Sequence, residues 1–75
     1  MSRLPSMSGE RLVRALKRAG FSVLRQKGSH ASLEKRTGDK VFRTVVPQHS
    51  TLAKGTLSDI LKQSGLTVDE LVELL

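Results

Sequence analysis

Two histidines, His30 and His49, are the side chains that remain for acid–base chemistry near neutral pH. The sequence has no cysteine, and no histidines or carboxylates have the spacing of a metal site. No glycine-rich phosphate loop stands between a predicted strand and a helix. We therefore expect no metal and no cofactor, and proton transfer by a histidine is the chemistry that these residues could supply.

His30 has the more suggestive surroundings of the two histidines. It begins a predicted strand directly after a short turn, and alternation points its side chain away from the core. The groups that could hold a phosphate beside it are the side chains of Arg25, Lys27, Ser29 and Arg43 and the backbone at Gly28. From the residues alone, an ordinary surface histidine at a strand start is the alternative interpretation.

His49 and Lys54 are weaker candidates. His49 lies in a loop after the third predicted strand, where a lone histidine is more often exposed or capping than catalytic. The sequence leaves open whether that strand ends beside His30. Lys54 could present an ammonium group and a helix N-terminus to a phosphate, or could simply begin a helix.

The charge of the chain points to a polyanionic partner. The chain has 75 residues, a formal net charge of +6 and only two aromatic residues. Residues 1–55 contain twelve basic and three acidic residues, whereas residues 56–75 contain one and four. A basic body favours nucleic acid, and the small size excludes a deep cofactor cavity.

No apolar run reaches the roughly 18 residues of a membrane span, and we see no signal-peptide core, so we expect a cytoplasmic protein without membrane contacts.

The pattern of apolar side chains predicts a helix followed by a small sheet. Residues 8–20 form an amphipathic helix, with Ser8 as N-cap and an apolar stripe made by Leu12, Val13, Leu16 and Ala19. Three strands follow at residues 21–26, 30–35 and 40–46. Phe21 and Val23 share one face of the first strand, and Ala31 and Leu33 form the core face of the second. Short glycine-containing turns favour an antiparallel meander.

Two helices complete the predicted fold. The first covers about residues 55–63 and ends near Gly65, and the second is short and begins at a capping box formed by Thr67 and Glu70. We predict an α+β fold of order α-β-β-β-α, with a three-stranded antiparallel sheet covered on one face by helices, plus a short C-terminal helix. Residues 1–7 are expected to be a flexible leader and residues 8–75 a single domain.

Three ordered motifs give the chain a family resemblance over about residues 8–75. They are Gly20-Phe21 leading to Arg25-Gln26-Lys27-Gly28-Ser29-His30, then Val45-Val46-Pro47-Gln48-His49, then Leu52-Ala53-Lys54-Gly55-Thr56-Leu57 with the following Ile60-Leu61-Lys62-Gln63-Ser64-Gly65-Leu66. In this order and at these separations they resemble the HicA family of small toxin ribonucleases, the YcfA-like mRNA interferases. Two positions depart from the family: Ala31 stands where many relatives carry a second histidine, and Leu33 where the residue is often aromatic.

The resemblance implies a fold like that of the double-stranded-RNA-binding domain. It also implies an endoribonuclease that cleaves mRNA without a metal ion, with His30 as the catalytic acid or base, and a HicB-type antitoxin as protein partner. On this basis we expect RNA contacts from Arg25, Lys27, Gly28, Ser29, Arg43, His49 and Lys54.

Two other functions are compatible with the residues. A non-catalytic RNA-binding module would use the same fold and charge, and would bind RNA without cleaving it. A DNA-binding repressor subunit is disfavoured because the two C-terminal helices carry net negative charge.

Overall fold

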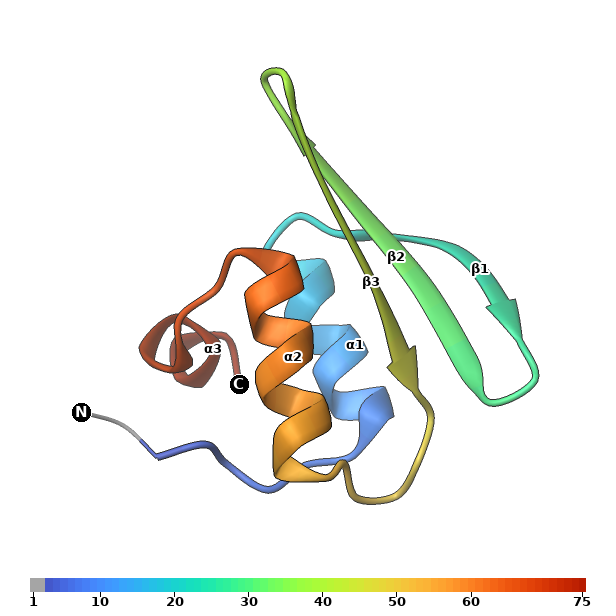
Figure 1. Cartoon of the computed structure of the whole chain (residues 1–75), viewed down its shortest axis with the longest axis vertical. Coiled ribbons are helices and arrows are strands. Elements are labelled where there is room, and N and C mark those ends of the chain that lie inside the picture. The colour runs from blue at the N-terminus through green and yellow to red at the C-terminus, as the bar shows by residue number, and fades with distance from the viewer. Residues whose placement is uncertain (1–2) are drawn as a thin grey trace.

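A helix, three strands and two helices follow one another in the computed structural model, which describes residues 3–75. The elements are α1 (Gly9–Arg18), β1 (Ser22–Lys27), β2 (His30–Thr37), β3 (Lys40–Pro47), α2 (Lys54–Ser64) and α3 (Val68–Leu74). The strands form one antiparallel sheet in the order β1-β2-β3, and the helices lie to one side of it (Figure 1). The predicted α+β fold is confirmed, including the short C-terminal helix.

Local capping groups set the ends of the helices. The Ser8 hydroxyl caps α1 by accepting a hydrogen bond from the Arg11 N–H at 3.1 Å. Gly65 ends α2 in the left-handed conformation, at φ 70°. At the start of α3, the Thr67 hydroxyl accepts from the Glu70 N–H while the Glu70 carboxylate accepts from the Thr67 N–H, which confirms the predicted capping box. No helix in the described part of the chain has the length and apolar character to cross a membrane.

Two-residue turns join the strands and fix their register. Gly28-Ser29 joins β1 to β2 and Gly38-Asp39 joins β2 to β3, and both glycines have φ 59°. Such turns favour glycine at the first position, because its backbone is left-handed there. The resulting register puts His30 opposite Lys27 on β1 and opposite Pro47 on β3. This settles the register that the sequence left open.

The core lies between the helices and one face of the sheet. Its largest fully buried side chains are Leu12, Leu16, Leu33, Leu57, Leu71 and Val46. The predicted core face of β2 is confirmed, since both Ala31 and Leu33 are 1% exposed. For the first predicted strand the expectation holds only in part: Phe21, just before β1, is buried, whereas Val23 in β1 is 38% exposed. The reason is that β1 is an edge strand away from the helices, with a bulge between Val23 and Arg25 (Figure 1).

The segment before α1 takes part in this core where the structure describes it. Met7 is 5% exposed, and its carbonyl accepts a hydrogen bond from the Leu52 N–H at 2.9 Å. Leu4 packs against the same cluster. A hydrophobic residue just before an N-cap commonly packs onto the first turn of its helix. The packed region therefore includes part of the segment expected to be a leader, while residues 1–2 lie outside the described residues.

Candidate functional site

Cross-strand pairing arranges the candidate residues in rows across the open face of the sheet, the face away from the helices. Because Ala31 and Leu33 are buried, the alternate residues of β2 point to the opposite side. The row at the end of the sheet contains Lys27, His30 and Pro47, the next contains Arg25, Ser32 and Val45, and the third contains Ser22, Glu34 and Arg43. The sheet thus brings Arg25, Lys27 and His30 together on one face.

His30 lies at the start of the central strand with its side chain exposed. Its Nδ1 is 3.5 Å from the Ser29 hydroxyl, at the outer limit of a hydrogen bond. Lys27 stands directly opposite, and side chains so paired have Cβ atoms about 4.5–5.5 Å apart. The turn at Gly28 is open, with nothing within 4 Å of the place where a Cβ would stand. One short stretch of chain therefore offers a proton carrier, a cation and a hydroxyl to a ligand approaching from solvent.

The loop that carries His49 is held to this end of the sheet. The Gln48 N–H donates to the Ser29 carbonyl, and the His49 carbonyl accepts from the Gly9 N–H at 3.0 Å. The loop backbone is thus tied to both the β1–β2 turn and the N-terminus of α1. The His49 side chain is exposed. The structure therefore places both histidines at the same end of the molecule.

Lys54 lies apart from the His30 row. It is the first residue of α2, and Figure 1 shows the start of this helix separated from the β1–β2 turn by the loop that follows β3. Ala53, the N-cap, gives the helix no side-chain hydrogen bond, and its first turn has no acidic residue. The positive end of this helix is therefore not neutralised by its own side chains.

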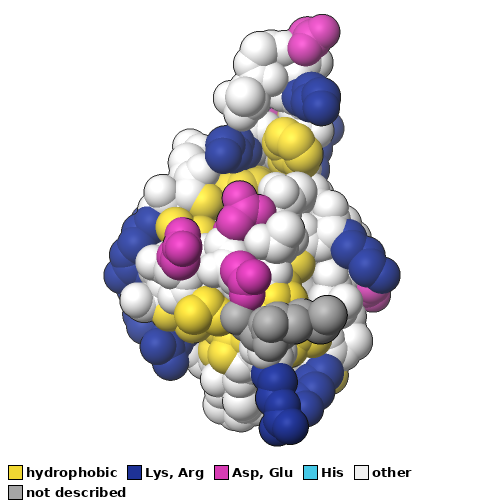
Figure 2. All heavy atoms as spheres, turned by 90° about the vertical axis from the view of Figure 1, so that its left-hand side faces the viewer, with side chains coloured by type: hydrophobic (Ala, Val, Ile, Leu, Met, Phe, Trp, Pro, Cys, Tyr) yellow, Lys and Arg dark blue, Asp and Glu magenta, His cyan; other side chains and the backbone are white. Residues whose placement is uncertain are grey.

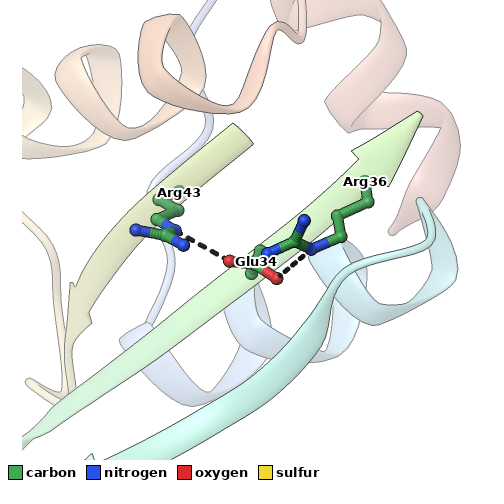
Figure 3. Close-up of polar contacts among 3 residues, drawn as sticks. All are labelled: Glu34, Arg36 and Arg43. Carbon is green, nitrogen blue, oxygen red and sulfur yellow. Dashed lines mark hydrogen bonds and ion pairs between the residues drawn. The ribbon is translucent and has the colours of Figure 1, made fainter. Parts of the chain in front are cut away.

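Arg43 also lies away from His30, in the third row. Glu34, its cross-strand partner, is four residues along β2 from His30, which corresponds to about 13 Å at the rise of a strand. The Arg43 Nε donates to Glu34 Oε2 at 2.7 Å, and the Arg36 Nε donates to Glu34 Oε1 at 2.9 Å (Figure 3). The bonds from Arg43 and then Arg36 hold the pKa of the Glu34 carboxyl below its ordinary value. The carboxylate therefore stays charged between its two partners.

Glu34 and Arg36 were not among the site residues predicted from the sequence. A signal was available, since residues 30, 32, 34 and 36 alternate onto one face of a strand. The predicted strand ended at residue 35, however, so Arg36 fell outside it. The observed β2 extends to Thr37, and this extension brings Arg36 onto the same face as His30.

The acidic residues near the C-terminus form a different face of the molecule. Figure 2 shows acidic side chains gathered around hydrophobic ones on the side that carries α3, and no histidine is visible there. Asp69 and Glu70 lie in the first turn of α3, and Val72 on the same helix is 44% exposed. The chain thus separates an acidic helical side from the sheet that carries the candidate residues (Figure 1).

The fold and this site define a small α+β domain with a histidine on a basic, open sheet face. The chain matches the family of HicA toxins of bacterial toxin-antitoxin systems over residues 9–66. The match runs from the first residue of α1 to just beyond α2, so it includes every candidate site residue. The chain belongs to this family, and membership implies an antitoxin as partner. No curated protein matches the chain closely enough to count as a relative.

Proposed function

We propose that this chain is a toxin endoribonuclease that cleaves mRNA in the cytoplasm, with His30 as general acid or base. The observation that carries the proposal is the row of Lys27 and His30 at the open end of the sheet. In the reaction, the ribose 2′-oxygen attacks the adjacent phosphorus, and the bond to the 5′-oxygen breaks. A base accepts the proton of the 2′-hydroxyl, and an acid protonates the leaving oxygen. Because the nucleophile is part of the substrate, the step requires no metal-bound water.

The chain offers a role for each neighbour of His30. Lys27 and Arg25 stabilise the negative charge that develops on the phosphate, and Ser29 donates to a phosphate oxygen. His49 is the candidate for the second proton carrier, because hydrogen bonds from Gln48 and Gly9 hold its loop beside this end of the sheet. Acid–base help from a positioned side chain is worth typically about 10²–10⁴-fold in rate. The exposed site predicts a slow enzyme, which suffices for a toxin.

Arg43 and Lys54 would contact the RNA strand away from the cleaved bond. Both are exposed and basic, and neither lies in the row of His30. A HicB-type antitoxin would neutralise the toxin by covering the open sheet face. Acidic groups on that partner would match the basic residues they cover.

The proposal is tested by incubating a long single-stranded RNA in EDTA with the wild type, His30→Ala and His49→Ala. We expect the wild type to cleave, His30→Ala to lose at least about 100-fold in rate while still binding RNA, and His49→Ala to lose less. Circular dichroism checks that both exposed sites tolerate the change. Cleavage by His30→Ala at the wild-type rate would refute the role of His30. Intact RNA in all lanes, with binding still seen by gel shift, would favour the non-catalytic RNA-binding module.

A further inference from the structure

The arrangement of Glu34, Arg36 and Arg43 is unusual for a surface ion pair. The Glu34 side chain is only 11% exposed, whereas those of Arg36 and Arg43 are 66% and 68% exposed. The carboxylate lies between two guanidinium groups (Figure 3), and the side chains that carry them are far more exposed than its own. An acidic residue on a face that binds RNA would ordinarily repel it, but here each carboxylate oxygen is paired with an arginine.

Among the described residues, the two arginines form their hydrogen bonds to Glu34 through Nε and not through their Nη groups. A guanidinium has five N–H donors in a planar fork, so the Nη groups of both remain for a ligand. Two arginines and one carboxylate leave a formal charge of +1, which matches one phosphodiester group. Because exposed ion pairs contribute little to stability, stability alone gives a poor reason for this arrangement.

We propose that Arg36 and Arg43, oriented by Glu34, form a second phosphate-binding site that grips the RNA strand about 13 Å from His30. This inference rests on the proposed function, because it places the second site on the strand that His30 cleaves. The two sites share the open sheet face and are linked by β2, so one extended strand of RNA can reach both. Glu34 is a positioning residue here: it holds the two forks and touches no substrate.

Binding to an RNA that cannot be cleaved tests the site independently of catalysis. The probe is a single-stranded oligonucleotide of about ten residues with 2′-O-methyl groups throughout, which has no attacking hydroxyl. We expect Arg36→Ala and Arg43→Ala each to raise Kd roughly tenfold and to reduce the slope of log affinity against log salt by about 0.7. Arg14→Ala is the matched control, because Arg14 pairs with Glu10 at 3.0 Å on α1 and is 54% exposed. Arg14 lies on α1, farther from the open sheet face than Arg36 and Arg43, so Arg14→Ala should change Kd less than the two other variants.

Glu34→Gln distinguishes positioning of the arginines from attraction by net charge, because the two predict opposite changes in RNA affinity. The substitution makes the protein one charge more positive, so attraction by net charge alone predicts tighter binding. Loss of the carboxylate that holds both arginines predicts weaker binding, by roughly two- to fivefold, the range of an exposed ion pair. Tighter binding by Glu34→Gln would overturn the positioning role.

Cleavage then separates the second site from the proposed function. On long RNA, Arg43→Ala should show a raised KM, while Arg14→Ala, the control on α1, should keep the wild-type KM. A wild type that binds but does not cleave would refute the nuclease and leave the second site standing. Arginine variants that bind RNA normally but lose the antitoxin would overturn the second site and assign these residues to the protein partner.

Discussion

Gly9→Ala and Gly55→Ala should change stability in opposite directions, although both replace a glycine in the first turn of a helix. Helix propensity alone predicts that alanine stabilises both positions, by up to about 1 kcal/mol. The structure distinguishes them. A Cβ at Gly9 would lie 1.9 Å from the Pro47 carbonyl oxygen and 3.0 Å from the Gln48 Cα, and these are backbone atoms that cannot rotate away. A Cβ at Gly55 meets nothing within 4 Å.

The size of the effect at Gly9 follows from the contacts that must move. Overpacking a buried position costs typically about 1–3 kcal/mol. Separating α1 from the loop also weakens the hydrogen bond from the Gly9 N–H to the His49 carbonyl, worth about 0.5–1.5 kcal/mol. After the gain in propensity, we expect Gly9→Ala to lower the free energy of unfolding by about 1–3 kcal/mol, out of about 4–11 for a domain of this size. In a small domain this corresponds to a fall in Tm of roughly 5–20 °C.

The assay is urea and thermal unfolding followed by circular dichroism, because the chain has no tryptophan or tyrosine for fluorescence. Gly9→Ala is compared with Gly55→Ala and the wild type at one pH and salt concentration. Because Gly9 holds the loop of His49, Gly9→Ala should also shift the NMR resonances of that side chain, and Gly55→Ala should shift them less. A Gly9→Ala protein as stable as Gly55→Ala would refute the close approach of α1 to Pro47.

Three further predictions concern the turns, the last helix and pH. Gly28→Ala and Gly38→Ala each put a Cβ at φ 59° into open space, so each should lower the free energy of unfolding in urea by about 1–2 kcal/mol. Only Gly28→Ala should also slow RNA cleavage. Equal slowing by both variants would contradict the placement of the site. Thr67→Ala removes a capping hydroxyl and should cost about 0.5–2 kcal/mol, measured in the same way, with an unchanged value counting against the capping box. The pKa of Glu34 is lowered by bonds from arginines and that of Glu70 by the backbone N–H of its capping partner, both from an ordinary value of 4.5. A lowered pKa in the folded state stabilises the fold above about pH 4.5, and this contribution is lost as the pH falls through the folded-state value. Below about pH 4.5, the free energy of unfolding should therefore fall less steeply with pH in a Glu34→Gln, Glu70→Gln double variant than in the wild type.

Structural features that depend on a few neighbouring residues could be predicted from the sequence. The capping box of Thr67 and Glu70, the helix end at Gly65 and the shared core face of Ala31 and Leu33 all follow from local hydrogen bonding or from the period of a strand. Each depends on neighbours no more than four residues away, so the sequence contains the whole cause.

Features that join distant segments could not be predicted in the same way. No local signal shows that Gly9 meets Pro47, since 37 residues separate them and only the packing of α1 against the loop brings them together. The bulge in β1, which leaves Val23 exposed, likewise depends on pairing with β2. The register is an intermediate case. A two-residue turn at Gly38-Asp39 is enough to put His30 opposite Pro47. The predicted strands ended at residue 35 and resumed at residue 40, so they left this register undetermined.

The candidate site lies on the opposite side of the sheet from the core. The side chains of Lys27, His30 and Arg43 are exposed on the open side of the sheet, while the buried side chains of β2 and β3 face the helices. Changes at the site therefore alter charge and chemistry with little loss of packing, which allows function to be tested without unfolding the protein. The acidic side chains of α3 lie on another side, so charge is unevenly distributed over the molecule (Figure 2). The nuclease proposed above would gain from this distribution, because the acidic side repels RNA and leaves the face that bears His30 to meet it.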